Sequence, residues 1–212
     1  MVAAAPGVGY THEPMHPTHR LGICAATTDR YFLNVEDGDP ERWAQALRNT
    51  ATFQHDMRAE WDAVQTPKDI ARMIRDAAIF GWHRYNGRRA LLKDPTALFS
   101  AEWIAQTLGA QVVGCSADAT LMRERLTPFA SEIRDAARQP EGGDLISRGS
   151  LLWCIFAHVT DTYQRCHEDW LFVRHEDLAH APVDGFQQMF DYLKIPFTRS
   201  VQQTIQQHTS QE

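Results

Sequence analysis

Three short runs of residues that could form strands are each followed by charged side chains that could take part in chemistry. Glu13 follows residues 8–12, Lys93 follows residues 89–92, and Arg174 opens a charged stretch after a third run. If the runs are parallel strands, their carboxyl ends meet at one edge, where α/β proteins bind ligands. A lysine there suits a phosphate or sulfate oxygen, and a glutamate could accept a proton from a hydroxyl. The same pattern also fits a surface ion pair between two loops.

A second group of candidate residues is the histidine series His12, His16 and His19. Imidazole is a common zinc ligand, so the spacing is compatible with a metal site. Pro14 and Pro17 interrupt the helix that would place such residues on one face. We therefore keep a zinc-binding protein as an alternative and predict no metal in the main interpretation.

Other patterns that would indicate a known chemistry are missing or better explained by packing. The sequence contains neither G-x-x-x-x-G-K-[ST] nor G-x-G-x-x-G. Ser150, His158 and Asp161 fall on or beside one helical stretch, which is poor geometry for a catalytic triad, and no G-x-S-x-G turn is present. The six tryptophans are spread along the chain and are expected in the core rather than on a base-stacking surface.

The elements that would position these residues alternate between strands and helices. Asp39-Pro40 and Thr66-Pro67 are helix starts, Ser100 is expected to cap a helix that ends at Gly109, and two short strands flank that helix. This pattern predicts one α/β domain over residues 1–212, a parallel β-sheet flanked by helices. Its expected parts are a helical insertion at 18–88, a βαβ unit at 89–115, a helical region at 116–168 with helices near 119–126, 129–138 and 144–167, and a C-terminal strand and helices at 169–212.

Composition limits the classes of partner. The 212 residues carry 21 Lys and Arg against 27 Asp and Glu, a net charge of −6, so a surface-wide cationic field for nucleic acid or anionic lipid is not expected, although a local basic pocket is allowed. No apolar run approaches the roughly 20 residues of a membrane helix. The four scattered cysteines indicate reduced thiols, and we predict a cytoplasmic protein. Homo-oligomerisation is left open.

Three stretches resemble the P-loop-like sulfotransferases that use 3′-phosphoadenosine 5′-phosphosulfate. The first is Ala5-Pro-Gly-Val-Gly-Tyr-Thr-His-Glu-Pro14, and the second is Leu91-Leu-Lys-Asp-Pro-Thr-Ala-Leu-Phe-Ser-Ala-Glu-Trp103 with its continuation to Val113. The third is Trp170-Leu-Phe-Val-Arg-His-Glu-Asp-Leu178, which continues to Phe197. The resemblance implies a P-loop NTPase-like sulfotransferase fold.

The resemblance implies roles for individual residues. Glu13 would be the general base that takes the acceptor proton, and Lys93 would contact the sulfuryl group and the bridging oxygen of the donor. The family's phosphosulfate loop would lie before Met1, so the chain is expected to be N-terminally truncated. The family's 3′-phosphate element would follow Val113, where this chain reads Gly114-Cys-Ser-Ala-Asp-Ala-Thr120. Arg123 or Arg125 could substitute for it.

Two functions follow as hypotheses from different classes. The first is sulfuryl transfer to a hydroxyl or amine acceptor, whose identity the sequence leaves open. The second is a non-catalytic, sulfotransferase-like interaction protein that pairs an exposed sheet edge with a partner or with itself.

Overall fold

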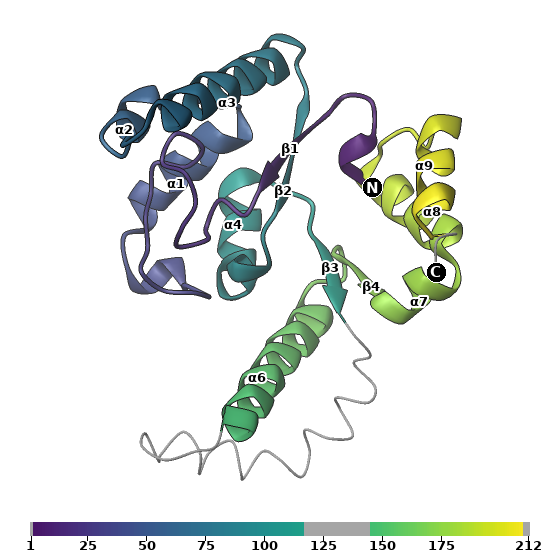
Figure 1. Cartoon of the computed structure of the whole chain (residues 1–212). Helices are drawn as coiled ribbons and strands as arrows, with labels where there is room; N and C mark the ends of the chain where they lie inside the picture. The colour runs from purple at the N-terminus through teal and green to yellow at the C-terminus, as the bar shows by residue number, and fades with distance from the viewer. Residues whose placement is uncertain (1, 117–144, 210–212) are drawn as a thin grey trace. The chain divides into compact units, whose positions relative to one another are not determined.

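The computed structural model describes residues 2–116 and 145–209, and its chain divides into two compact units, Met1–Gln111 and Val112–Glu212. The described part is a mixed α/β protein that is mostly helical and contains two small parallel sheets (Figure 1). Each sheet has two strands, β1 with β2 and β3 with β4. Among the described residues, no helix is both long enough and apolar enough to cross a membrane.

The first unit contains one parallel strand pair and its covering helices. Strands β1 and β2 pair in register from Val8 opposite Arg89 to His12 opposite Lys93. The elements, in chain order, are η1 (Val2–Ala4), β1 (Val8–His12), η2 (Val35–Asp37), α1 (Pro40–Ala51), α2 (Met57–Trp61), α3 (Pro67–Tyr85), β2 (Arg89–Lys93), η3 (Pro95–Ser100) and α4 (Ala101–Leu108).

Helix starts in this unit follow the local chemistry of the sequence. The Asp39 carboxylate accepts a hydrogen bond from the Arg42 amide, and Thr66 with Asp69 forms a reciprocal capping box at the start of α3. Ser100 stands at the N-cap position of α4, as predicted, but its hydroxyl makes no capping hydrogen bond and instead donates to the Leu33 carbonyl and accepts from the Val35 amide. Ser100 therefore anchors the loop before α1.

The core of the first unit lies between the loop that follows β1 and the helices α1 and α4. Its buried side chains come from segments far apart in the sequence. They are Met15, Cys24, Ala26, Val35, Trp43, Ala46, Leu47 and Ala97, with Leu33, Trp103, Ile104 and Leu108 partly buried against them. Burial of this apolar surface holds the loop between β1 and α1 in place although it has little regular structure.

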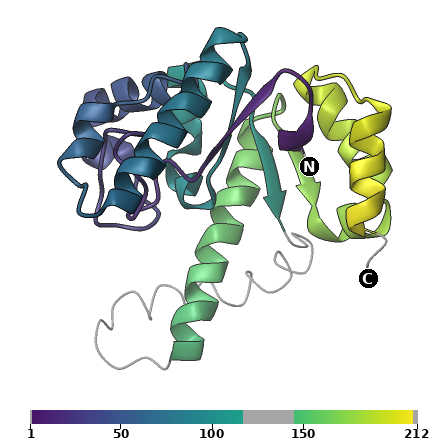
Figure 2. The same ribbon diagram turned by 45° about the horizontal axis from the view of Figure 1, so that its top comes forward.

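The described part of the second unit contains the other strand pair and four helices (Figure 2). Strands β3 and β4 pair in parallel from Val113 opposite Leu171 to Ser116 opposite Arg174. The elements are β3 (Val113–Ser116), α6 (Leu145–Cys166), β4 (Leu171–Arg174), α7 (His175–His180), α8 (Pro182–Leu193) and α9 (Arg199–Thr209). Phe190, Leu193, Val201 and Ile205 are buried in the α8–α9 pair.

The predicted order of elements is largely confirmed, but the predicted βαβ unit at 89–115 does not close into one sheet. Strand β2 pairs with β1, whereas β3 pairs with β4. The reason is that strand pairing is decided by long-range partners, and a strand–helix–strand order constrains those partners only weakly. The helices predicted near 119–126 and 129–138 lie outside the described residues.

Candidate functional site

The two predicted catalytic residues come together at the carboxyl edge of the β1–β2 pair. His12 at the end of β1 lies opposite Lys93 at the end of β2, and the Glu13 amide then donates to the Lys93 carbonyl at 2.8 Å. The side chains meet as well, since Lys93 Nζ lies 2.5 Å from Glu13 Oε1. Their predicted proximity is thus confirmed, and it follows from the parallel register.

The backbone around Glu13 is held in an uncommon conformation. Glu13 has φ of +46°, in the left-handed region that non-glycine residues adopt at a cost of about 1 kcal/mol. Two contacts compensate for this cost in the following residues. The Met15 amide donates to Asp94 Oδ2 at 2.6 Å, and the Met15 side chain is buried in the core.

Asp94 links the two loops that leave the strand ends. Its second oxygen, Oδ1, accepts hydrogen bonds from the amide and the hydroxyl of Thr96. One carboxylate therefore holds both the turn after β1 and the start of η3. This tether keeps the Glu13 carboxylate beside the Lys93 ammonium without depending on their own ion pair.

The charge states of the pair are set mainly by the hydrogen bond between them. That bond lowers the pKa of Glu13 below its ordinary 4.5, against an opposing effect of burial, and His12 adds to the lowering. The same bond raises the pKa of Lys93 above 10.5. Near neutral pH the site thus contains a carboxylate and an ammonium. Glu13 is 19% exposed and Lys93 is 51% exposed, so the cation is the more accessible partner.

Two further side chains border the ion pair, and the sequence reasoning did not assign them to it. His12 Nε2 lies 3.5 Å from Glu13 Oε1, and the Tyr10 ring packs edge-on against the His12 ring with centroids 6.0 Å apart. Both are exposed, whereas Thr11 between them is buried. The strand alternation over residues 8–12 was the available signal, because it places Tyr10 and His12 on one face.

The histidine alternative is not supported by the positions of the rings. His19 Nδ1 lies 2.6 Å from the His16 carbonyl and His19 Nε2 lies 2.7 Å from the Cys24 carbonyl, so both ring nitrogens are already engaged. His16 Nδ1 contacts Thr18. In the described ranges 2–116 and 145–209, no three potential ligands gather around a common point.

A third predicted residue, Arg174, lies in the β3–β4 sheet and not in the β1–β2 sheet. Arg174 ends β4 in the second unit, where its Nε lies 3.9 Å from Asp177 Oδ2. The expectation that three strand ends meet at one edge is therefore not met, because β4 belongs to a different sheet. Arg123 and Arg125 lie outside the described residues.

A cluster of buried charges lies in the first unit, and the sequence did not predict it. Arg20 donates to Asp76 Oδ2 at 2.5 Å and also binds Glu60. His55 Nε2 lies 3.0 Å from Glu60 Oε2, and burial of the His55 ring lowers its pKa. Arg20 is 40 positions from Glu60 and 56 from Asp76 in the sequence, so no local pattern indicates that they form ion pairs. The cluster attaches the loop after Glu13 to α2 and α3.

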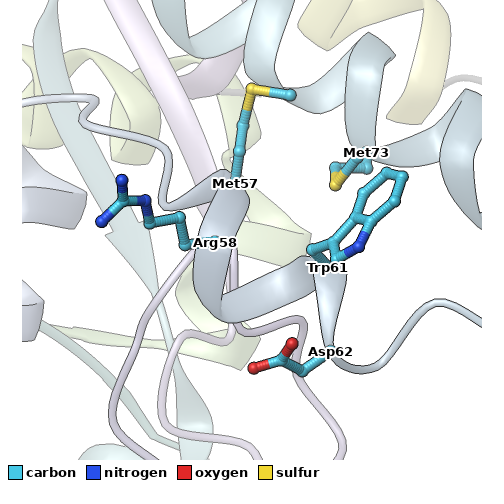
Figure 3. Close-up of a pocket in the computed structure, with 5 residues that line it drawn as sticks. All are labelled: Met57, Arg58, Trp61, Asp62 and Met73. Carbon is cyan, nitrogen blue, oxygen red and sulfur yellow. The ribbon is translucent and has the colours of Figure 1, made fainter.

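A hollow between α2 and α3 is lined by different residues from those of the ion pair (Figure 3). Trp61 packs beside Met73, while Met57 and Arg58 project from the start of α2. Asp62 completes the lining. The hollow contains no paired acid and base, so Glu13 and Lys93 remain the candidate reactive groups.

Comparison with known proteins adds no assignment. No protein-family model matches this chain, and no curated protein or solved structure matches it either. The resemblance to sulfotransferases remains a prediction that rests on the residues quoted for it.

Proposed function

We propose that this protein transfers a sulfuryl group from 3′-phosphoadenosine 5′-phosphosulfate to a hydroxyl or amine acceptor. The observation that carries the proposal is the Glu13–Lys93 pair at the carboxyl edge of two parallel strands. Such edges are where open α/β proteins bind anionic ligands. The proposed donor, 3′-phosphoadenosine 5′-phosphosulfate, is inferred from the resemblance of the sequence around both residues to sulfotransferases.

In this proposal the two residues have complementary roles. The acceptor O–H or N–H proton passes to the Glu13 carboxylate as the acceptor atom forms its bond to sulfur. The bond between sulfur and the bridging oxygen breaks, and its electron pair goes to the 5′-phosphate of the leaving nucleotide. Lys93 Nζ neutralises that charge, a stabilisation that is larger in the transition state than in the bound donor.

The charge states of the resting site support these roles. Glu13 is a carboxylate near neutral pH, as its ordinary pKa of 4.5 already implies, so it is able to accept a proton. The Lys93 hydrogen bond lowers that pKa and weakens the base, so transfer of Lys93 to a donor oxygen would make Glu13 more basic. Lys93 is the more exposed partner and could exchange its contact with Glu13 for a donor oxygen. The loop tether through Asp94 would keep Glu13 in position during this exchange.

The test is calorimetric titration of the whole chain with adenosine 3′,5′-bisphosphate, the nucleotide product. We expect a Kd near the micromolar range, about −8 kcal/mol. Lys93→Ala should weaken binding by about tenfold to a hundredfold, since a charge-assisted contact is worth about 1.5–3 kcal/mol. Lys68→Ala removes an exposed lysine from α3 and should leave the Kd unchanged. No heat at millimolar nucleotide, in a sample shown to be folded, would contradict the proposal.

A second candidate is a non-catalytic interaction protein. The observation that favours it is an exposed apolar face on α3, which catalysis at Glu13 and Lys93 does not use. A folded chain that binds no nucleotide but has a partner at that face would support this candidate.

A further inference from the structure

Helix α3 carries an apolar stripe that faces solvent. Ile74, Ala78, Trp82 and Tyr85 recur at spacings of four, four and three residues, so they share one face of the helix. All four are exposed, with Trp82 at 51% and Tyr85 at 90%. A Cβ added at Gly81 on the same face would meet no atom within 4 Å, so among the described residues this part of the face is open. We call these four residues the α3 stripe.

The opposite face of α3 is what attaches the helix to its unit. Met73, Asp76 and Phe80 are buried there, and Phe80 packs edge-on against Phe53 with ring centroids 5.6 Å apart. The capping box at Thr66 fixes the start of the helix independently of the stripe. The stripe residues therefore contribute little to the fold, and their exposed apolar surface needs another explanation.

The charge around the stripe differs in sign from the charge of the whole chain. Residues 57–93 contain eight Lys or Arg and four Asp or Glu, a net charge of +4, whereas the chain carries −6. Two of those acids, Glu60 and Asp76, are buried in ion pairs with Arg20. The exposed cations on α3 are Lys68, Arg72, Arg75 and Arg84.

Trp82 itself lies beside a cation. The Arg88 guanidinium carbon is 3.8 Å from the centroid of the Trp82 ring, a cation–π contact. The same arginine donates to the Val8 carbonyl at 3.0 Å, which holds it in place. The stripe thus combines aliphatic side chains, two amphipathic aromatic rings and flanking positive charge.

A second copy of this chain fits the stripe poorly. In an antiparallel pairing centred on Ala78, Arg72 of one copy would face Arg84 of the other. In a parallel pairing, Arg72 would face Arg72. Like charges placed opposite one another disfavour both arrangements.

A nucleic acid would match the positive charge but not the apolar surface. Single-stranded nucleic acid is bound by a basic groove with aromatic rings on which bases stack. Ile74 and Ala78 lie in the first half of the stripe and offer neither a stacking surface nor a hydrogen bond. An anionic surface with an apolar interior matches both properties.

We propose that the α3 stripe docks the protein onto the surface of an anionic lipid bilayer. The stripe would enter the boundary between headgroups and acyl chains, and the flanking cations would contact the lipid phosphates and carboxylates. Trp82 and Tyr85 have the amphipathic rings that favour this depth. The stripe extends about 16 Å along the helix, from the 1.5 Å rise per residue. The buried face stays in the core, so the helix would lie on the membrane and not span it.

The experiment is sedimentation of the whole chain with lipid vesicles. One set contains phosphatidylcholine alone, and the other contains phosphatidylcholine mixed with phosphatidylserine. We expect binding only to the second set, with weakening as salt increases. Arg72→Gln and Arg84→Gln should each weaken binding by about fivefold, since a cation near such a surface is worth about 1 kcal/mol. Ile74→Ser combined with Trp82→Ser should weaken it by at least about tenfold.

The matched control is Trp153→Ser on α6. Trp153 is 52% exposed, almost the same as Trp82, but it lies in the other unit. This variant should bind phosphatidylserine vesicles as the unchanged chain does.

Four results would overturn the proposal. They are absence of binding to phosphatidylserine vesicles by folded protein, equal binding to phosphatidylcholine alone, equal loss in Trp153→Ser, and capture by single-stranded DNA without vesicle binding. A dimer that the Ile74→Ser, Trp82→Ser variant disrupts would instead assign the stripe to self-association. The nucleotide titration above uses other residues, so the two proposals can fail separately.

Discussion

Replacing Arg20 with methionine should destabilise the first unit more than any single surface substitution. Arg20 is the shared partner of two carboxylates, Glu60 and Asp76, from α2 and α3. Their side chains are 6% and 11% exposed, so neither can recover full hydration when the guanidinium is removed. Arg75 contacts Asp76, at 2.8 Å, and could still compensate that carboxylate. Glu60 would keep its contact with His55, but the lowered pKa of that ring leaves it uncharged near neutral pH, so it supplies no counter-charge.

The expected loss follows from the burial of these groups. Removing one partner of a buried ion pair costs about 3–5 kcal/mol, because the remaining charge stays buried. The Arg20 side chain is itself 29% exposed, which admits water and places the expected loss near the lower end, about 3 kcal/mol. Methionine keeps most of the side-chain volume, so a cavity contributes little.

The assay is urea unfolding at neutral pH, followed by far-UV circular dichroism and tryptophan fluorescence. The control is Arg165→Met on α6, which removes an ion pair with Asp161 between residues four apart on one helix. That pair lies at the helix surface and should cost about 0.3–0.5 kcal/mol. If Arg20→Met costs no more than Arg165→Met, the buried cluster does not hold the loop after Glu13, and the reasoning is refuted.

Three further predictions concern the same unit. Burial lowers the pKa of His55 below its ordinary 6.5, so the unfolded chain binds more protons than the folded chain in acid. The free energy of unfolding should therefore be greatest above pH 6.5 and should fall as the pH decreases from 6.5 through the lowered pKa. Urea unfolding midpoints above and below pH 6.5 measure this loss of stability. If His55→Gln shows the same pH dependence of the midpoint as the unchanged chain, His55 is not its cause. Gly9→Ala should cost about 1–3 kcal/mol, because the new Cβ would lie 2.4 Å from the Phe53 ring. Gly81→Ala, which meets no atom within 4 Å, should instead stabilise by about 0.5–1 kcal/mol, and equal unfolding midpoints for the two variants would refute the packing argument.

Local sequence signals predicted the elements well where the chemistry was local. The strand at residues 8–12, the helix start at Thr66-Pro67 and the helix end at Gly109 are confirmed. Each depends on residues within one turn of the chain. The short helix α2 was not predicted, although the Asp56 carboxylate caps it by accepting from two amides. Five residues give too weak a periodic pattern to recognise.

The candidate site was predicted in part, for a related reason. Glu13 and Lys93 were predicted at one edge because each follows a strand, and the carboxyl ends of parallel strands lie at the same edge of a sheet. His12 and Tyr10 were missed because their role depends on which face of β1 is exposed. Arg174 was wrongly expected at the same edge because the partner of β4 is β3.

The sequence by itself determined where most strands and helices begin and end, and which residues carry reactive groups, because capping, turn formation and periodicity act between near neighbours. Only the tertiary structure decided which strands pair, that Arg20 compensates two buried carboxylates, and that α3 turns an apolar face to solvent. Those features depend on contacts between residues tens of positions apart. The free energy of such contacts comes from burial and from the loss of solvent around charges, which no local pattern records.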